Sequence, residues 1–284
     1  MQYARIAFSS MILVFAIAMS SSAQSAPAPE QPDAMDLLKS VELAYGAINT
    51  YSAKVTNTMA MDGSDAQGKM NVETSLTVIV DASGKFRIES KGMIGMLMVN
   101  DGNTMWMYMP MANSYSKIPM NGDTAYVSVR GGGAMFGGAY APLQYRSAMS
   151  GVKEAKILRS ERLRVNDADV DCWVVALEDE PMSNEGSAAA EAAGVKVSDF
   201  SRNKTLWVDK TRYLVYQEDS TAKMTMPNAS TPTNMKQTSK VESVTINEPV
   251  SPDVFTFTPP AGAKEMDQSQ SMRLKTSQTQ KDQE

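Results

Sequence analysis

The chain has 284 residues, of which 43% are hydrophobic and 21% charged, and its formal net charge is -5. These proportions are typical of a soluble globular protein, and an acidic chain without a basic patch does not favour nucleic acid as a partner. The sequence contains no histidine, which removes the commonest general base and metal ligand. Cys172 is the single cysteine, so an intrachain disulfide and a thiolate metal cluster are excluded. With no outstanding pair of carboxylates either, we expect no catalytic residues, no metal and no cofactor.

Residues 1–23 have the pattern of a secretory signal peptide. Arg5 supplies the positive start, and residues 11–19 form an apolar run too short to span a bilayer. Small residues precede the cleavage expected after Ala23. No cysteine lies near this point, so we expect a periplasmic protein that is exported and not lipidated. Residues 24–33 follow as a proline-rich linker.

An amphipathic helix is predicted over residues 34–48, with Asp33 as its N-cap. Its apolar positions recur every three or four residues and make one stripe that must be buried against another element. The stripe consists of Leu37, Leu38, Val41, Ala44, Tyr45 and Ile48.

Alternating polar and apolar residues predict about 11 strands after the helix, mostly joined by hairpins. The main runs are 51–61, 69–80, 86–89, 96–108, 114–118, 155–165, 170–178, 206–216 and 236–247, and residues 252–263 end the ordered part. The glycine-rich segment 130–140 is either a lid or a plain flexible loop. Residues 181–201 are expected to be a surface insertion, and 266–284 a disordered polar tail.

The hairpin over residues 96–108 contains four alternating methionines. Asp101-Gly102 predicts a two-residue type I′ turn, which would place Met98 opposite Met105 and Met96 opposite Met107. All four methionines then share one face, and Leu97, Trp106 and Tyr108 fall on the other. Two interpretations stay open at this point: an ordinary half-buried sheet in a methionine-rich protein, or an adaptable surface that receives a flexible apolar guest.

The predicted fold is mainly β (α+β), with one domain over residues 34–265. We expect an incomplete antiparallel β-barrel of about 11 strands, with an N-terminal helix and short helices over its concave face.

Three segments make the chain resemble the periplasmic lipoprotein carrier LolA and its superfamily. They are Tyr51-Ser52-Ala53 after the N-terminal helix, the run from Gly84 to the stretch DGNTMWMYMP ending at Pro110, and the ending FTFTPPAG at 255–262. The resemblance implies an unclosed barrel whose concave face binds lipoprotein acyl chains or another lipid. By position, the lipid-binding residues would be Phe86, Ile88, Met96, Met98, Met105 and Met107.

The resemblance implies a carrier in outer-membrane lipoprotein sorting, which acts as a monomer between an inner-membrane exporter and an outer-membrane acceptor. The alternative is an envelope sensor module that binds lipid or lipoprotein and regulates a sigma-factor signalling protein. The chain also departs from the carrier pattern. An Arg-Pro pair that helps hold the carrier's lid is replaced here by Asp81-Ala82-Ser83-Gly84.

Overall fold

The computed structural model describes residues 31–62, 69–92, 95–120, 141–179, 203–224 and 233–266. From residue 32 onward they belong to one compact unit. The predicted signal peptide lies outside the described residues, as do residues 130–140, 181–201, most of the linker and the tail beyond Met266.

Helix α1 (Ala34–Gly46) begins where the sequence predicts. The Asp33 carboxylate accepts hydrogen bonds from the amides of Met35 (2.8 Å) and Asp36 (3.2 Å), which confirms the N-cap. The helix ends two residues before the predicted boundary. The predicted apolar stripe is buried at Leu37, Leu38, Val41, Tyr45 and Ile48, while Ala44 is half-buried.

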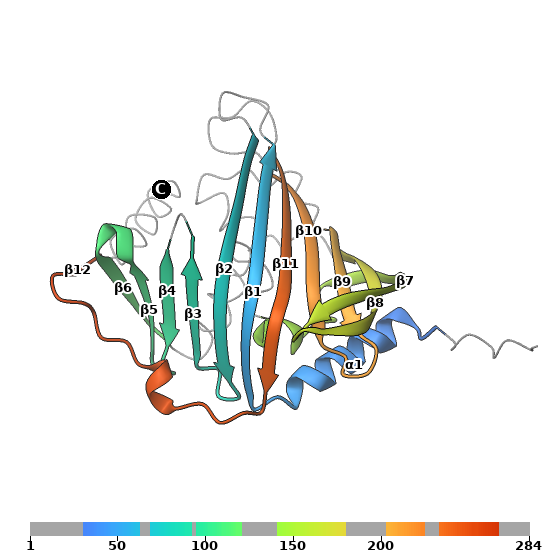
Figure 1. The fold of residues 1–284 in the computed structure, drawn as a ribbon, viewed down its shortest axis with the longest axis horizontal. Helices are drawn as coiled ribbons and strands as arrows, with labels where there is room; N and C mark the ends of the chain where they lie inside the picture. Colours follow the sequence, from blue (N-terminus) through green and yellow to red (C-terminus); the bar gives the residue numbers. More distant parts are fainter. Residues whose placement is uncertain are drawn as a thin grey trace, which may run out of the picture. The chain divides into compact units, whose positions relative to one another are not determined.

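Twelve strands within the described residues form one sheet (Figure 1), in the order β12-β6-β5-β4-β3-β2-β1-β11-β10-β9-β8-β7. Their bounds are β1 (Thr50–Asp62), β2 (Lys69–Asp81), β3 (Phe86–Lys91), β4 (Met96–Asn100), β5 (Thr104–Met109), β6 (Ser114–Pro119), β7 (Val152–Val165), β8 (Ala168–Asp179), β9 (Asn203–Asp209), β10 (Val215–Met224), β11 (Thr233–Ile246) and β12 (Lys264–Glu265). Short helices are η1 (Pro110–Ala112), α3 (Ala141–Tyr145) and η2 (Pro252–Phe255). Neighbouring strands are antiparallel except β12 and β6. The open sheet confirms the predicted incomplete barrel, and the extra strand is the two-residue β12.

Of the described helices, α1 and α3 pack on one face of the sheet, which we call the helix face. Tyr45 of α1 packs against Tyr51 of β1, with ring centroids 6.4 Å apart. Tyr145 of α3 contacts the ring of Tyr45 and donates a hydrogen bond to Glu218 of β10. The core lies between the helices and this face. Its buried strand residues include Tyr51, Ala53, Val55, Leu76, Val78, Val80, Phe86, Ile88, Leu206 and Val244.

The β4–β5 hairpin differs from the predicted register. Met98 pairs with Met107, and Asn100 pairs with Met105, so the connection is two residues longer than a two-residue turn. The reason is the Asp101 side chain, whose carboxylate accepts hydrogen bonds from the amides of Asn103 and Thr104, both at 2.8 Å. A type I′ turn needs positive φ at both central residues, but of the pair only Gly102 has it (φ +97°). The prediction of the turn was therefore wrong. Because the register shifts by an even number, the predicted faces are kept.

A two-residue turn joins β7 to β8. Its residues Asn166 (φ 51°) and Asp167 (φ 59°) both have the left-handed conformation and lie between the paired Val165 and Ala168. This turn also reaches β11. The Asn166 amide donates to the Glu242 carbonyl (3.0 Å), beside a bulge in the β1–β11 pairing. The Asn166 side chain donates to the Val244 carbonyl (2.9 Å) and accepts from the Val244 amide (2.8 Å). The strands from β11 to β7 thus curl back until the β7–β8 turn meets β11.

On the opposite face, the C-terminal segment contacts β3 at η2 and then runs to β12 beside β6 (Figure 1). Phe257 packs against Trp106 (5.7 Å between centroids) and Tyr108 (5.8 Å). Strand β12 then pairs with Ser114 and Tyr115 of β6. Trp106 and Tyr108 therefore lie on the face that the alternation predicts.

Candidate functional site

All six predicted lipid-binding residues lie on the helix face. Ile88 of β3 pairs with Met98 of β4, which in turn pairs with Met107 of β5. Residues paired directly across antiparallel strands point to the same side, so the sheet brings these three together. Phe86 shares this face through its pairing with Asn100, which pairs with Met105. Met96 pairs with Ser90 on β3.

Burial divides the six into two groups. Phe86, Ile88, Met98 and Met105 belong to the core, with at most 4% of each residue exposed. Met96 and Met107 are half-buried and pack against the core from its margin. Met109 and Ile118, which share the helix face by register, are half-buried as well. We call Met96, Met107, Met109 and Ile118 the methionine strip. Its members can contact a ligand without unfolding the core.

A second group of methionines lies on the helix face at the far end of β1, β2 and β11. Met61 pairs directly with Met70 on one side and with Met235 on the other. Met59 lies two residues away on the same face. All four are at least partly exposed. None of the four was among the predicted lipid-binding residues, although the alternation in 51–61 places Met59 and Met61 on the face of Tyr51.

Between the core and these methionines the helix face carries a row of buried polar side chains. Asn57 of β1 pairs with Ser239 of β11, which pairs with Glu218 of β10. One step further along the strands, Gln237 pairs with Ser220. We call Asn57, Glu218, Ser220, Gln237 and Ser239 the polar band. Each is at most 7% exposed. Polar residues at these positions give no apolar alternation, so the sequence pattern does not indicate that they are buried.

Asn57 is bonded within the polar band, whereas Glu218 is bonded to α3 through only one of its two carboxyl oxygens. The side chains of Gln237 (3.2 Å) and Ser239 (3.3 Å) both donate to Asn57 Oδ1. Glu218 Oε2 accepts from the Tyr145 hydroxyl and from Gln144 Nε2 (3.0 Å) of α3. Burial, and then the nearby Glu218 carboxyl, raise the pKa of Tyr145 well above its usual value. Within the described part of the chain, Glu218 Oε1 is buried without a partner.

Helix α1 is tied to its surroundings by a few polar contacts. The Tyr45 hydroxyl accepts a hydrogen bond from the Val215 amide of β10 (3.1 Å). Arg146, just after α3, donates to the carbonyls of Tyr45 (3.4 Å) and Ile48 (3.1 Å) at the end of α1. The Glu42 carboxylate accepts from the Met149 amide (2.9 Å). The segment after α3 therefore caps the C-terminal end of α1.

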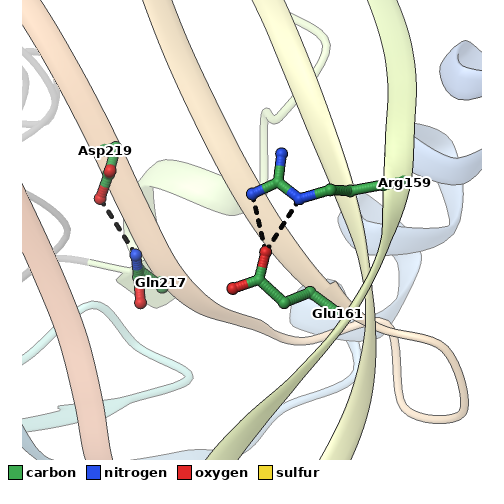
Figure 2. Close-up of polar contacts among 4 residues, drawn as sticks. All are labelled: Arg159, Glu161, Gln217 and Asp219. Carbon is green, nitrogen blue, oxygen red and sulfur yellow. Dashed lines mark hydrogen bonds and ion pairs between the residues drawn. The ribbon is translucent and has the colours of Figure 1, made fainter.

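The opposite face of β7 and β10 carries polar pairs (Figure 2). Arg159 donates two hydrogen bonds to Glu161 on β7, and Gln217 donates one to Asp219 on β10. Gln217 and Glu218 are consecutive, so the Gln217–Asp219 pair lies on the other side of the sheet from the polar band. Arg159 shares the side of Gln217 through the pairing of Gln217 with Trp207, of Trp207 with Val174 and of Val174 with Arg159. The ion pair is about half exposed, and such surface pairs contribute little to stability. This polar surface does not favour an apolar ligand.

Neither a metal site nor a membrane-spanning helix is found among the described residues. They hold no group of three or more Asp, Glu, Cys or His side chains placed to bind a metal. The helices among them are too short or too polar to cross a bilayer.

No protein-family model matches the chain, and no curated protein does either. Solved structures are similar to it at low identity. An uncharacterized conserved protein of Thermus thermophilus is 12% identical, with a TM-score of 0.42, over 82% of this chain and 97% of the other. A LolA superfamily protein of Nitrosomonas europaea is 12% identical, with a TM-score of 0.31, over 80% and 99%. MucB of Pseudomonas aeruginosa, solved in complex with MucA, is 11% identical, with a TM-score of 0.36, over 80% and 62%. Similarities at this level carry no information on ligand or activity.

Proposed function

We propose that this protein is a non-catalytic, exported carrier that holds the acyl chain of a lipoprotein or another lipid against the methionine strip. In this role it would take its cargo from an exporter in the inner membrane to an acceptor in the outer membrane. The supporting observation is the methionine strip itself, which lies half-buried at the margin of the core on the helix face. Methionine is flexible and polarisable, so such a surface can repack around chains of different shape.

The expected affinity is compatible with a carrier. Each buried methylene contributes about 0.8 kcal/mol, so about ten methylenes would contribute about 8 kcal/mol. That free energy corresponds to a Kd on the order of 1 μM, before the cost of ordering the chain is subtracted. Binding of this strength shields the chain from water and still permits transfer.

The side chains available for chemistry favour binding over catalysis. The sequence has no histidine. Burial, with a smaller contribution from Asp209, raises the pKa of the Cys172 thiol to about 12, which keeps it in the unreactive protonated form.

The test is lipid binding by two matched variants on β4. Met96→Asp places a charge on the methionine strip, whereas Leu97→Asp places it at the next residue, which is also half-buried but lies on the opposite face. We expect Met96→Asp to lower the affinity for a fluorescent fatty-acid amide at least tenfold, since a charge is costly to bury against an acyl chain. Leu97→Asp should leave the affinity within about threefold of the wild type, because its side chain does not face the ligand. Equal loss in both variants, or no binding by the wild type, would refute the proposal. An assay of lipid exchange between vesicles then distinguishes a carrier, which should transfer the lipid, from a sensor, which need only bind it.

A further inference from the structure

We propose that the polar band selects the cargo by its head group, binding amphiphiles whose head donates hydrogen bonds, such as an ammonium or an amide N–H, and disfavouring acyl chains that end in a carboxylate. This inference rests on the proposed function, since it concerns the polar end of a ligand whose chain lies on the helix face.

The polar band continues directly from the apolar part of the helix face. Along β1, the core residue Val55 is followed on the same face by Asn57, and along β11 Val241 is followed by Ser239. Alternate residues of a strand are about 7 Å apart, which is a few methylene lengths. An amphiphile that lies along this face therefore passes from apolar to polar side chains within its own length.

Glu218 is the member of the band that lacks a partner. The residue is 3% exposed, and both donors that α3 supplies bind Oε2. Oε1 finds no donor among the described residues. A buried acceptor without a hydrogen bond costs free energy that a donor brought by a ligand would recover.

The charges around the band favour a donor over an acceptor. Lys204 of β9 pairs with Ser220 across the strands, and its Nζ already forms an ion pair with Asp179 Oδ2 at 2.8 Å. Asp179 Oδ1 is a second buried oxygen for which the described chain offers no hydrogen bond. The helix face thus carries two carboxyl groups and one lysine here, and among the described residues it is an oxygen of each carboxyl group that lacks a hydrogen bond. A carboxylate head would meet repulsion here, and an ammonium would meet attraction.

A different pair of polar groups could hold a head without selecting its charge. Ser114 and Ser116 of β6 lie on the helix face opposite Met109 and Met107, and within the described ranges their buried hydroxyls are also unpartnered. A hydroxyl both donates and accepts, so these serines would accept any polar head. A preference for one charge of head group over another would therefore indicate that the head binds at the polar band and not at the two serines.

The experiment compares ligands with the same dodecyl chain, measured by calorimetry on the full mature protein below their critical micelle concentrations. The four probes are dodecylamine, N-methyldodecanamide, dodecyltrimethylammonium and dodecanoate. The trimethylated cation keeps the positive charge but has no N–H to donate. We expect the amine and the amide to bind at least about tenfold more tightly than dodecanoate, with the trimethylated cation weaker than the amine, because only N–H donors satisfy the unpartnered carboxyl oxygens.

Two variants test whether the preference for one head group over another arises at Glu218. Glu218→Gln keeps the size of the side chain and an acceptor for Tyr145, and should reduce the preference for the amine over dodecanoate at least about fivefold. Ser116→Ala is the matched control and should leave that preference unchanged. A purely structural role of Glu218 would change the melting temperature without changing the ratio of the two affinities.

The outcomes separate the two proposals. If no probe binds, the carrier function fails. If all four bind equally, or if dodecanoate binds best, the carrier function stands and the selection by the polar band is overturned. The wild-type ratios decide this point even if Glu218→Gln does not fold.

Discussion

Arg146 should control how readily α1 leaves the sheet. Its guanidinium donates to two carbonyls at the C-terminal end of α1, and the last turn of α1 contains no basic residue of its own. The Tyr45 carbonyl already accepts from the Ile48 amide (3.3 Å), and Ile48 itself lies just beyond the helix. The guanidinium therefore adds a charged donor at this end and supplies the cation that the helix dipole favours there. Replacement of Arg146 by Met keeps much of the side-chain volume and removes both effects.

The magnitude follows from these contacts. One bond is of ordinary length (3.1 Å) and the other is long (3.4 Å). A hydrogen bond from a charged donor contributes about 1.5 kcal/mol or more, and the dipole term adds about 0.5 kcal/mol. The variant should lose about 2 kcal/mol, which increases the population with α1 displaced about thirtyfold. If the acyl chain enters only when α1 is displaced, the apparent Kd falls by up to the same factor.

Hydrogen exchange of the α1 amides, combined with lipid titration, measures both effects. Arg146→Met should exchange faster in α1 and bind lipid more tightly. Arg162→Met is the control, because Arg162 forms a largely exposed ion pair with Asp171 on the β7–β8 hairpin and has no bond to α1. The reasoning is refuted if α1 exchanges at the wild-type rate in Arg146→Met, or if faster exchange leaves the lipid affinity unchanged.

Two further predictions concern stability. Asn166→Ala removes both side-chain hydrogen bonds to Val244 and places alanine at positive φ, so urea unfolding should show a loss of about 3 kcal/mol. Asn166→Gly should lose less, and equal losses would contradict the strain contribution. Burial raises the pKa values of Tyr45, Tyr51 and Tyr145 above the usual value near 10. The unfolded chain releases these protons above about pH 10 while the folded protein keeps them, so stability should be complete below pH 10 and fall as the pH rises further. Urea midpoints measured from pH 8 to 11 check this, and a flat profile would contradict it.

Local patterns in the sequence predicted the strands and their faces well. The Asp33 cap, the stripe of α1 and the alternation of β3 to β5 depend on residues close together in the chain. Even the wrong turn at Asp101-Gly102 kept Met98 and Met107 on the predicted face, because the register error was an even number of residues.

The remaining features depend on residues far apart in the sequence. The capping of α1 by Arg146 and the contact of Asn166 with β11 join segments that no local pattern relates. The polar band has the same origin. Asn57 and Glu218 look like ordinary surface residues of their strands until the sheet order places Ser239 between them. Six residues were predicted to bind lipid, and burial then showed that four of them also build the core.

The pairing of β12 with β6 has a consequence for biosynthesis. Tyr115 bonds to Glu265, a residue 150 positions later, and β12 covers the start of a strand that would otherwise end the sheet with unpaired backbone groups. Uncovered strand edges invite pairing with other chains. If the polypeptide crosses a membrane from its N-terminus, β6 emerges long before the residues that protect it. During that interval the uncovered edge of β6 is open to pairing with other chains, which favours aggregation.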